Sequence, residues 1–298
     1  MSTAEFDSLT EAAGELGLDP GVVPPTERRD VDLGDGQHLS LIQWGGTDPE
    51  LVFLHGGAQN AHTWDLVALG LGRPALALDL PGHGHSSWRE DKDYGPFRNA
   101  EAVAAVIEKH APDARGVVGM SLGGLTAIRL AAARPELVRR ALLVDVTPGS
   151  ADAVAAMSAV QRGAVALASG PRTFDSLDDM VNAAVKASPR RPASAVRRGV
   201  IHNSRQLPDG TWAWRYDLPA RRSVEEMSGL WDDVDRLAMP VLLVRGGESG
   251  FVTDDDLAEA QRRLPSLRVE TVPGAGHAVQ SDQPAALTRL VREFLIDG

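Results

Sequence analysis

The sequence predicts an α/β domain with a mostly parallel, eight-stranded sheet and helices on both of its faces. Two observations favour this fold class. Short apolar runs of strand length alternate with amphipathic segments of helix length over most of the 298 residues. The hydrophobic fraction of 43% is typical of a soluble globular protein, and a chain of this length can bury a large core. Strands that alternate with helices indicate a parallel sheet, because each crossover helix covers one face of the sheet.

The first 25 residues are predicted to be a helical extension that precedes the sheet. Residues 4–18 fit a short amphipathic helix, and Pro20 ends it. Residues 4–18 carry four acidic residues and no basic stretch, so we do not interpret this extension as a signal peptide.

The core is predicted to comprise residues 26–146 and 237–298. A hairpin signal, Asp35-Gly36, joins its first two strands. The eight predicted strands are residues 28–33, 38–44, 51–54, 75–78, 117–118, 141–144, 241–244 and 268–272. The helices between and after them are residues 61–71, 97–110, 122–133, 254–264 and 284–296.

The alternation stops between residues 147 and 236, which we interpret as an insertion into the core. Helical segments are predicted at 151–168 and 177–187, and an Asp209-Gly210 turn follows a basic stretch. The pattern of strands and helices resumes after Pro240.

Composition excludes several classes of function. The net charge of −11 disfavours nucleic acid as a partner, since phosphate binding needs a basic surface. The absence of cysteine excludes disulfides and thiolate metal sites, and it is compatible with a reducing compartment. No apolar run approaches the roughly 20 residues of a membrane span. We therefore expect a cytoplasmic protein that is a monomer or a homodimer and has no membrane partner.

The most informative motif is Gly-Met-Ser-Leu-Gly at residues 119–123. An apolar strand precedes it and an alanine-rich helix follows it, so Ser121 lies at the apex of a sharp strand–turn–helix bend. Side chains at Gly119 or Gly123 would collide with neighbouring backbone in so tight a bend. The helix N-terminus favours developing negative charge. Ser121 is therefore the predicted nucleophile of a hydrolase.

Two other strand ends carry chemistry that such a nucleophile needs. His55-Gly56-Gly57-Ala58 follows an apolar strand, and the backbone N–H groups of Gly57 and Leu122 are predicted to form an oxyanion hole. His277 lies in a glycine-rich loop after the last strand and is the predicted general base, because a serine hydroxyl is a poor nucleophile without one. His55 is predicted to be structural, and Asp79, His83 and His85 are assigned no catalytic role.

The acid that orients the histidine is left open between two carboxylates. Asp145 ends the strand after the nucleophile helix, and Glu248 follows the next strand. Either position would place a carboxylate at the carboxyl edge of the sheet, where the site is expected.

Together these motifs resemble those of the α/β-hydrolase superfamily over residues 28–146 and 240–298. The family resemblance rests on His55-Gly56 with Trp64 downstream, the Asp79–Ser86 loop, the Gly119–Gly123 turn and the Gly274–His277 loop. The resemblance implies a triad in the order serine, acid, histidine. The family usually has its acid where this chain has Ser249, while a smaller group of esterases has it at the position of Asp145. Asp145 is therefore the preferred acid and Glu248 the alternative.

The resemblance also implies that residues 147–236 form a mainly helical lid over the site. The expected substrate pocket includes Gly56, Ala58, Trp64 and Trp214. One of the many arginines between residues 186 and 222 could bind a substrate carboxylate, or these arginines could pair with the core.

The sequence thus predicts a serine hydrolase that cleaves an ester-like bond of a small molecule through an acyl-enzyme. No metal or organic cofactor is expected. The same triad could instead open lactones, hydrolyse thioesters or cleave a carbon–carbon bond. A ligand receptor or interaction protein on the hydrolase scaffold is the alternative from another class.

Overall fold

The main sheet has eight strands in the order β1-β2-β4-β3-β5-β6-β10-β11. A computed structural model describes residues 5–19, 21, 23–34, 36–150, 172–217 and 224–298 of the chain. The strands are β1 (Thr26–Gly34), β2 (Gln37–Trp44), β3 (Leu51–Leu54), β4 (Ala75–Leu78), β5 (Gly116–Met120), β6 (Ala141–Val144), β10 (Val241–Gly246) and β11 (Arg268–Val272).

Strands β3 to β11 of this sheet run parallel, and β1 and β2 add an antiparallel edge. The central strands β3, β4, β5 and β6 are buried along their whole length. Leucine, valine and alanine fill them because both faces of the sheet are covered. The mostly parallel eight-stranded sheet is therefore confirmed. The parallel strands bring their carboxyl ends to one edge.

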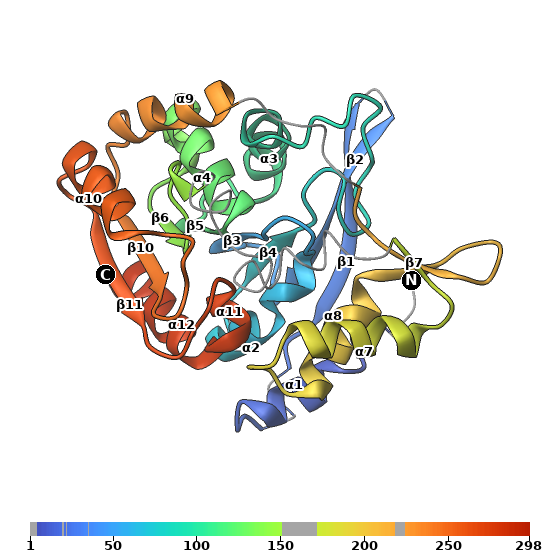
Figure 1. The fold of residues 1–298 in the computed structure, drawn as a ribbon. Helices are drawn as coiled ribbons and strands as arrows, with labels where there is room; N and C mark the ends of the chain where they lie inside the picture. Colours follow the sequence, from blue (N-terminus) through green and yellow to red (C-terminus); the bar gives the residue numbers. More distant parts are fainter. Residues whose placement is uncertain (1–4, 20, 22, 35, 151–171, 218–223) are drawn as a thin grey trace.

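Helices cover both faces of the sheet, as Figure 1 shows. One face packs against α3 (Pro96–His110), α4 (Leu122–Ala133), α9 (Val224–Asp235) and α10 (Asp254–Arg263). The other packs against α1 (Leu9–Glu15), α2 (Asp65–Leu71) and α12 (Pro284–Val291). Short helical turns complete the core: η3 (Ala61–Trp64), η4 (Pro135–Leu137), α11 (Val279–Asp282) and η5 (Arg292–Ile296). None of the helices in the described ranges is long and apolar enough to span a membrane.

The N-terminal extension is tied to the core by ion pairs. Glu5 accepts hydrogen bonds from Arg28 at 2.7 Å and from His62 at 3.0 Å. Arg28 is buried and also pairs with Asp79 at 2.8 Å. Burial raises the pKa of Glu5, but His62 and Arg28 outweigh it and hold that pKa at about 2. The predicted helix exists as α1, although it is shorter than residues 4–18.

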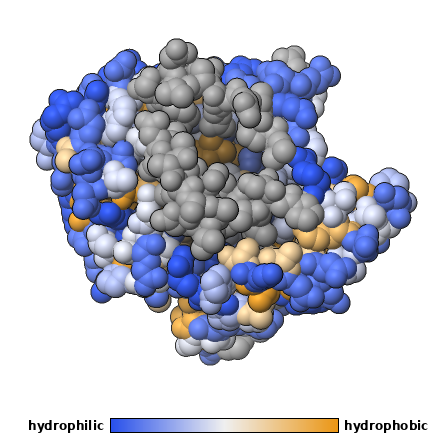
Figure 2. Space-filling model, in the orientation of Figure 1, coloured by the Kyte–Doolittle hydropathy of each residue, from blue (hydrophilic) through white to orange (hydrophobic). Residues whose placement is uncertain are grey.

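Residues 147–236, which the sequence predicts to be an insertion, contain more than the predicted helices. Their described part holds α7 (Leu177–Ala187), α8 (Ala193–His202) and a three-stranded antiparallel sheet, and it ends in α9, which packs on the main sheet. The strands of this sheet are β7 (Thr173–Phe174), β8 (Ser204–Gln206) and β9 (Trp212–Trp214). The predicted helix at 151–168 lies outside the described residues. On the face drawn in Figure 2, the described surface is mostly hydrophilic.

Candidate active site

Ser121 lies between the end of β5 and the start of α4, in a strained conformation. Its backbone has φ of 50° and ψ of −115°, a region that residues with a side chain rarely adopt. The Ser121 N–H donates to the carbonyl of Val144 on β6 at 3.2 Å, which anchors the turn to the neighbouring strand. Strain of this kind persists only where the surroundings impose it, and it often marks a functional residue.

The two glycines of the motif are required by close backbone contacts. A Cβ atom on Gly119 would lie 2.4 Å from the carbonyl oxygen of Gly123. One on Gly123 would lie 2.2 Å from the carbonyl oxygen of Leu54, at the end of β3. Because rigid backbone blocks both positions, the collision predicted from the sequence is confirmed.

We expect Gly123→Ala to lower the free energy of unfolding by about 1–3 kcal/mol or more, since the new methyl group must displace the end of β3. Gly57→Ala is the matched control, because a Cβ atom there meets open space. Urea denaturation of the two variants measures the difference. Equal stability of both variants would contradict the packing argument.

His277 and Asp145 are brought together from distant parts of the chain. The Nδ1 atom of His277 lies 2.8 Å from Oδ2 of Asp145. Asp145 directly follows β6, has a φ of 51° and is fully buried, while the side chain of His277 is 10% exposed. Nδ1–H can donate to the carboxylate, which leaves the lone pair of Nε2 available to accept a proton.

Asp145 is held by two further donors, and Glu248 lies elsewhere. The backbone N–H of Gly246 donates to Oδ1 of Asp145 at 2.9 Å, and the hydroxyl of Ser249 donates to Oδ2 at 2.5 Å. The Glu248 side chain is 54% exposed and faces Arg190 at 3.6 Å. The histidine therefore has a buried carboxylate partner at Asp145, and Glu248 is instead part of a surface ion pair.

Two residues near the histidine were missed by the sequence analysis. Phe251 stacks on the imidazole of His277 with ring centroids 3.4 Å apart and an angle of 9° between the planes. Ser249 holds the carboxylate, as its hydrogen bond to Asp145 shows. The position of Ser249, where the family usually has its acid, was a signal for that contact. Nothing in the sequence indicated the ring contact of Phe251.

The loop after β3, residues 55–58, is held in place by hydrogen bonds of two neutral histidines, His55 and His83. The Leu80 N–H donates to Nε2 of His55, so Nδ1–H of His55 must donate to the carbonyl of Gly56 at 2.7 Å. Burial lowers the pKa of His55, in agreement with this neutral form. His83 accepts from the Ala58 N–H in the same way, at 3.1 Å. His55 is therefore structural, as predicted.

Asp79 is likewise bound within the scaffold. It is fully buried and accepts hydrogen bonds from Arg28 and from the backbone N–H groups of Ala61 and His85. Burial raises its pKa, but the charge of Arg28 and these hydrogen bonds outweigh that effect and lower it. These hydrogen bonds hold loops of the scaffold in place, which is consistent with the prediction that Asp79 has no catalytic role.

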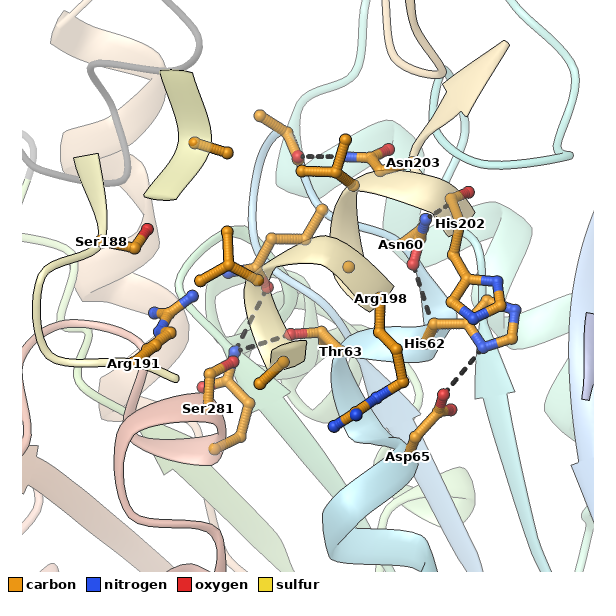
Figure 3. A pocket seen from close by; sticks show the side chains of 18 of the residues that line it. Asn60, His62, Thr63, Asp65, Ser188, Arg191, Arg198, His202, Asn203 and Ser281 are labelled. Carbon is orange, nitrogen blue, oxygen red and sulfur yellow. Dashed lines mark hydrogen bonds and ion pairs between the residues drawn. The ribbon is translucent and has the colours of Figure 1, made fainter. Parts of the chain in front are cut away.

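A cavity of about 180 Å³ lies between the loop after β3 and the insertion. Figure 3 shows polar side chains that line it, which come from η3, α2, α8 and α11, from the residues that flank η3 and α8, and from the segment that follows α7. Gly57, Ala58 and Trp214 line it, as do Gln280 and Ser281 shortly after His277. Ser121 and His277, the predicted nucleophile and base, are not among its lining residues.

Two expected pocket residues lie elsewhere. Trp64 is fully buried in the core and stacks on Phe53 of β3, with centroids 5.1 Å apart. It does not line the cavity, because η3 turns the ring toward the sheet. Gly56 packs under the turn, where a Cβ atom would lie 2.4 Å from the sulfur of Met120 and 3.3 Å from Cβ of Ser121.

The arginines of the insertion that approach the cavity are already paired with carboxylates. Arg191 donates to Asp282 at 2.7 Å. Arg198 binds Glu15 of α1 through both terminal nitrogens. These contacts favour pairing with the core over binding of a substrate carboxylate. Arg221 and Arg222 lie outside the described residues.

Three side chains on the cavity wall are of types that bind metal ions. The ligand atoms of His62, Asp65 and His202 lie within 4.8 Å of one another. The two imidazoles are stacked, however, with centroids 3.7 Å apart and an angle of 15° between the planes. Ring lone pairs lie in the ring planes, so two stacked rings cannot direct them at one ion. The arrangement does not fit a metal site as it stands, and the expectation of no metal stays a prediction.

The two histidines of this cluster differ in their protonation state at neutral pH. Burial disfavours the charge on His62, but Asp65 and Glu5 outweigh it and raise its pKa to about 9. Burial and the neighbouring charge of His62 lower the pKa of His202 to about 4. At neutral pH a cationic ring thus stacks on a neutral one, which joins the core to α8.

Comparisons with known proteins agree with this fold. The model of the alpha/beta hydrolase family matches residues 51–290. The chain is 54% identical to esterase Rv0045c of Mycobacterium tuberculosis over 292 residues, which cover 98% of this chain and 95% of that protein. A crystal structure of that esterase covers 100% of this chain and 99% of its own, with a TM-score of 0.86 and 49% identity. The structure of E-2-(acetamidomethylene)succinate hydrolase covers 92% of this chain and 100% of its own, with a TM-score of 0.75 and 26% identity.

The parallel sheet carries a strained serine after β5 and a histidine–carboxylate pair formed by the segments after β11 and β6, and these features define a hydrolase of the α/β class. The chain belongs to the alpha/beta hydrolase family.

Proposed function

We propose that this protein is a serine esterase that cleaves carboxylic esters of small molecules through an acyl-enzyme. Ser121 is the nucleophile, His277 the general base and Asp145 the acid that orients it. The hydrogen bond between His277 and Asp145 is the observation that carries the proposal, since Asp145 follows β6, the strand that pairs with β5 before the strained Ser121. The name of the Mycobacterium tuberculosis relative, an esterase 54% identical to this chain, supports it.

The proposed reaction follows from the donors and acceptors at the site. Oγ of Ser121 attacks the ester carbonyl while Nε2 of His277 takes its proton, and Asp145 stabilises the resulting imidazolium. The backbone N–H groups of Gly57 and Leu122 are proposed to bind the oxyanion. His277 then protonates the departing alcohol, and a water molecule activated by the same histidine releases the acid.

Other reactions share these catalytic groups. Thioester and lactone hydrolysis, and carbon–carbon bond cleavage, use the same nucleophile, and a receptor could retain the same residues. No observation favours any of them over ester cleavage. The lid role of residues 147–236, the cytoplasmic location and the oligomeric state stay predictions from the sequence.

The test is turnover of p-nitrophenyl acetate and p-nitrophenyl butyrate. We expect continuous release of nitrophenol over many equivalents of protein, because water regenerates Ser121 after each acylation. A single burst of one equivalent would indicate a binding protein whose serine is acylated but not released. No release at all would contradict the proposed function.

A further inference from the structure

His277, the proposed general base, directly follows a glycine. Gly276 has no side chain to restrict its backbone dihedral angles, so by itself it leaves the direction of the next residue open. Asp145 orients the imidazole once the ring is within hydrogen-bond distance, but the backbone at Gly276 decides whether the ring reaches that place. The contacts that hold this stretch of backbone therefore bear on the alignment of the base.

The peptide unit between Ala275 and Gly276 is held at both of its polar groups. Its carbonyl accepts a hydrogen bond from the Glu248 N–H at 2.9 Å. Its N–H donates to Oδ2 of Asp282 at 2.9 Å. Asp282 is the last residue of α11, so its side chain reaches back across the segment that contains His277. With both groups bound, the plane of this peptide is fixed immediately before the base.

The Asp282 carboxylate is buried, and two arginines after α7 balance its charge. The side chain is 3% exposed. Nε of Arg191 donates to Oδ1 at 2.7 Å, and Nε of Arg190 lies 3.5 Å from Oδ2. Figure 3 shows Arg191 beside α11, which carries Ser281. Arg190 also packs on the glycine, since a Cβ atom on Gly276 would collide with its guanidinium group.

These arginines keep the Asp282 carboxylate charged and directed at the glycine. A buried carboxylate without a cationic partner is strongly disfavoured, so it takes up a proton or turns toward solvent. Either change weakens its hydrogen bond to the Gly276 N–H, because a charged acceptor makes the stronger bond.

We propose that Asp282 is a positioning residue for His277 and that Arg191 keeps the Asp282 carboxylate in place. This inference rests on the proposed function, in which His277 is the general base. Both side chains act through the backbone at Gly276 and need not touch the substrate. The alignment of the base thereby depends on a contact made by the segment after α7.

The experiment measures kcat and KM for p-nitrophenyl butyrate and the rate at which diisopropyl fluorophosphate inactivates the protein. Asp282→Ala removes the acceptor of the Gly276 N–H and should lower kcat about 10- to 100-fold, because small misplacements of a catalytic group cost up to about 10² in rate. KM should stay within about twofold, since binding that is equal in ground and transition states is unaffected. Inactivation should slow in parallel, because it also needs His277 as a base.

Arg191 supplies a conservative pair of variants. Arg191→Ala should lower kcat about tenfold, the effect of about one hydrogen bond to a charged group. Arg191→Lys keeps the positive charge and should restore kcat to within about threefold of the wild type. The Arg191 side chain is 24% exposed, so these variants test the proposal even if Asp282→Ala does not fold. Thermal unfolding of each preparation shows which variants are folded.

A double variant tests whether Arg191 acts through Asp282. Arg191 also lines the cavity, and a contact with the substrate would change KM and would persist in the Asp282→Ala background. If Arg191 acts through Asp282, adding Arg191→Ala to Asp282→Ala should change kcat less than about twofold. Arg197→Ala is the matched control: Arg197 pairs with Asp178 of α7 at 2.8 Å, is half exposed and is not among the cavity-lining residues, so all three rates should stay unchanged.

The outcomes separate this inference from the proposed function. If the Asp282 and Arg191 variants cleave the ester and react with the fluorophosphate as fast as the wild type, the positioning role is overturned and the esterase function stands. An increase in KM with unchanged kcat, or an Arg191→Ala loss that persists in the double variant, would also overturn the positioning role. If the wild-type protein does not turn over p-nitrophenyl butyrate, the proposed function fails and this inference fails with it.

Discussion

Ser121→Ala is expected to lower kcat for p-nitrophenyl butyrate by about four to six orders of magnitude while the protein stays folded. The loss follows because alanine offers no atom that can form the acyl-enzyme, and removal of one triad member usually disables the whole unit. The fold should tolerate the change. Alanine has the same Cβ atom on the same strained backbone, and the Ser121 hydroxyl makes no capping hydrogen bond to α4. Steady-state kinetics and thermal unfolding of the same preparation measure both effects.

Ser266→Ala is the control for this experiment. Ser266 is an exposed serine in the loop between α10 and β11, so its replacement should change neither kcat nor stability by a measurable amount. Undiminished activity of Ser121→Ala with an unchanged melting temperature would show that another residue is the nucleophile. Unfolding of Ser121→Ala would contradict the argument that its hydroxyl has no structural role.

The sheet was predictable from the sequence because its strands are buried on both faces. The apolar runs predicted at 51–54, 75–78 and 141–144 coincide with β3, β4 and β6. Glycine and polar residues after each run mark where these strands end. For the same reason the strand-end positions of Ser121, His277 and Asp145 were predictable from the sequence.

The small sheet of the insertion could not be predicted in the same way. Its strands have only two or three residues, too short to show a period of two. One of them, β7, pairs with β9 across a long stretch of chain, since Thr173 lies opposite Ala213. The four-residue helix α11 escaped prediction for the same reason of length.

The placement of Trp64 and the identity of the carboxylate beside His277 depend on tertiary contacts that the sequence does not show. Trp64 lies in the segment after the Gly56-Gly57 turn, where the sequence predicted a pocket residue. Its stacking contact with Phe53 shows that the ring packs in the core instead. Asp145 and Glu248 both follow strands, and the sequence does not say which carboxylate turns toward the histidine. The structure brings Asp145 to His277 because β6, β10 and β11 lie side by side in the sheet, and Ser249 occupies the position that the family's usual acid has.

Asp145→Asn should lower kcat strongly, whereas Glu248→Gln should leave it nearly unchanged. Three donors converge on Asp145: the Gly246 N–H, the Ser249 hydroxyl and Nδ1–H of His277. Asparagine offers one oxygen to these donors and directs an N–H at one of them, so His277 loses the orientation or the tautomer that it needs as a base. We expect kcat to fall about 10⁴-fold, as in other triads whose aspartate becomes asparagine.

Glu248→Gln is expected to change kcat less than about twofold. Its carboxylate is half exposed and lies 3.6 Å from Arg190, an ion pair of a kind that contributes roughly 0–1 kcal/mol. The comparison uses kcat and the rate at which an organophosphate inactivates Ser121, because both require His277 as a base, and thermal unfolding confirms that each variant is folded. If Glu248→Gln alone lowers both rates by orders of magnitude, Glu248 is the acid, and the bond between His277 and Asp145 serves structure instead of catalysis.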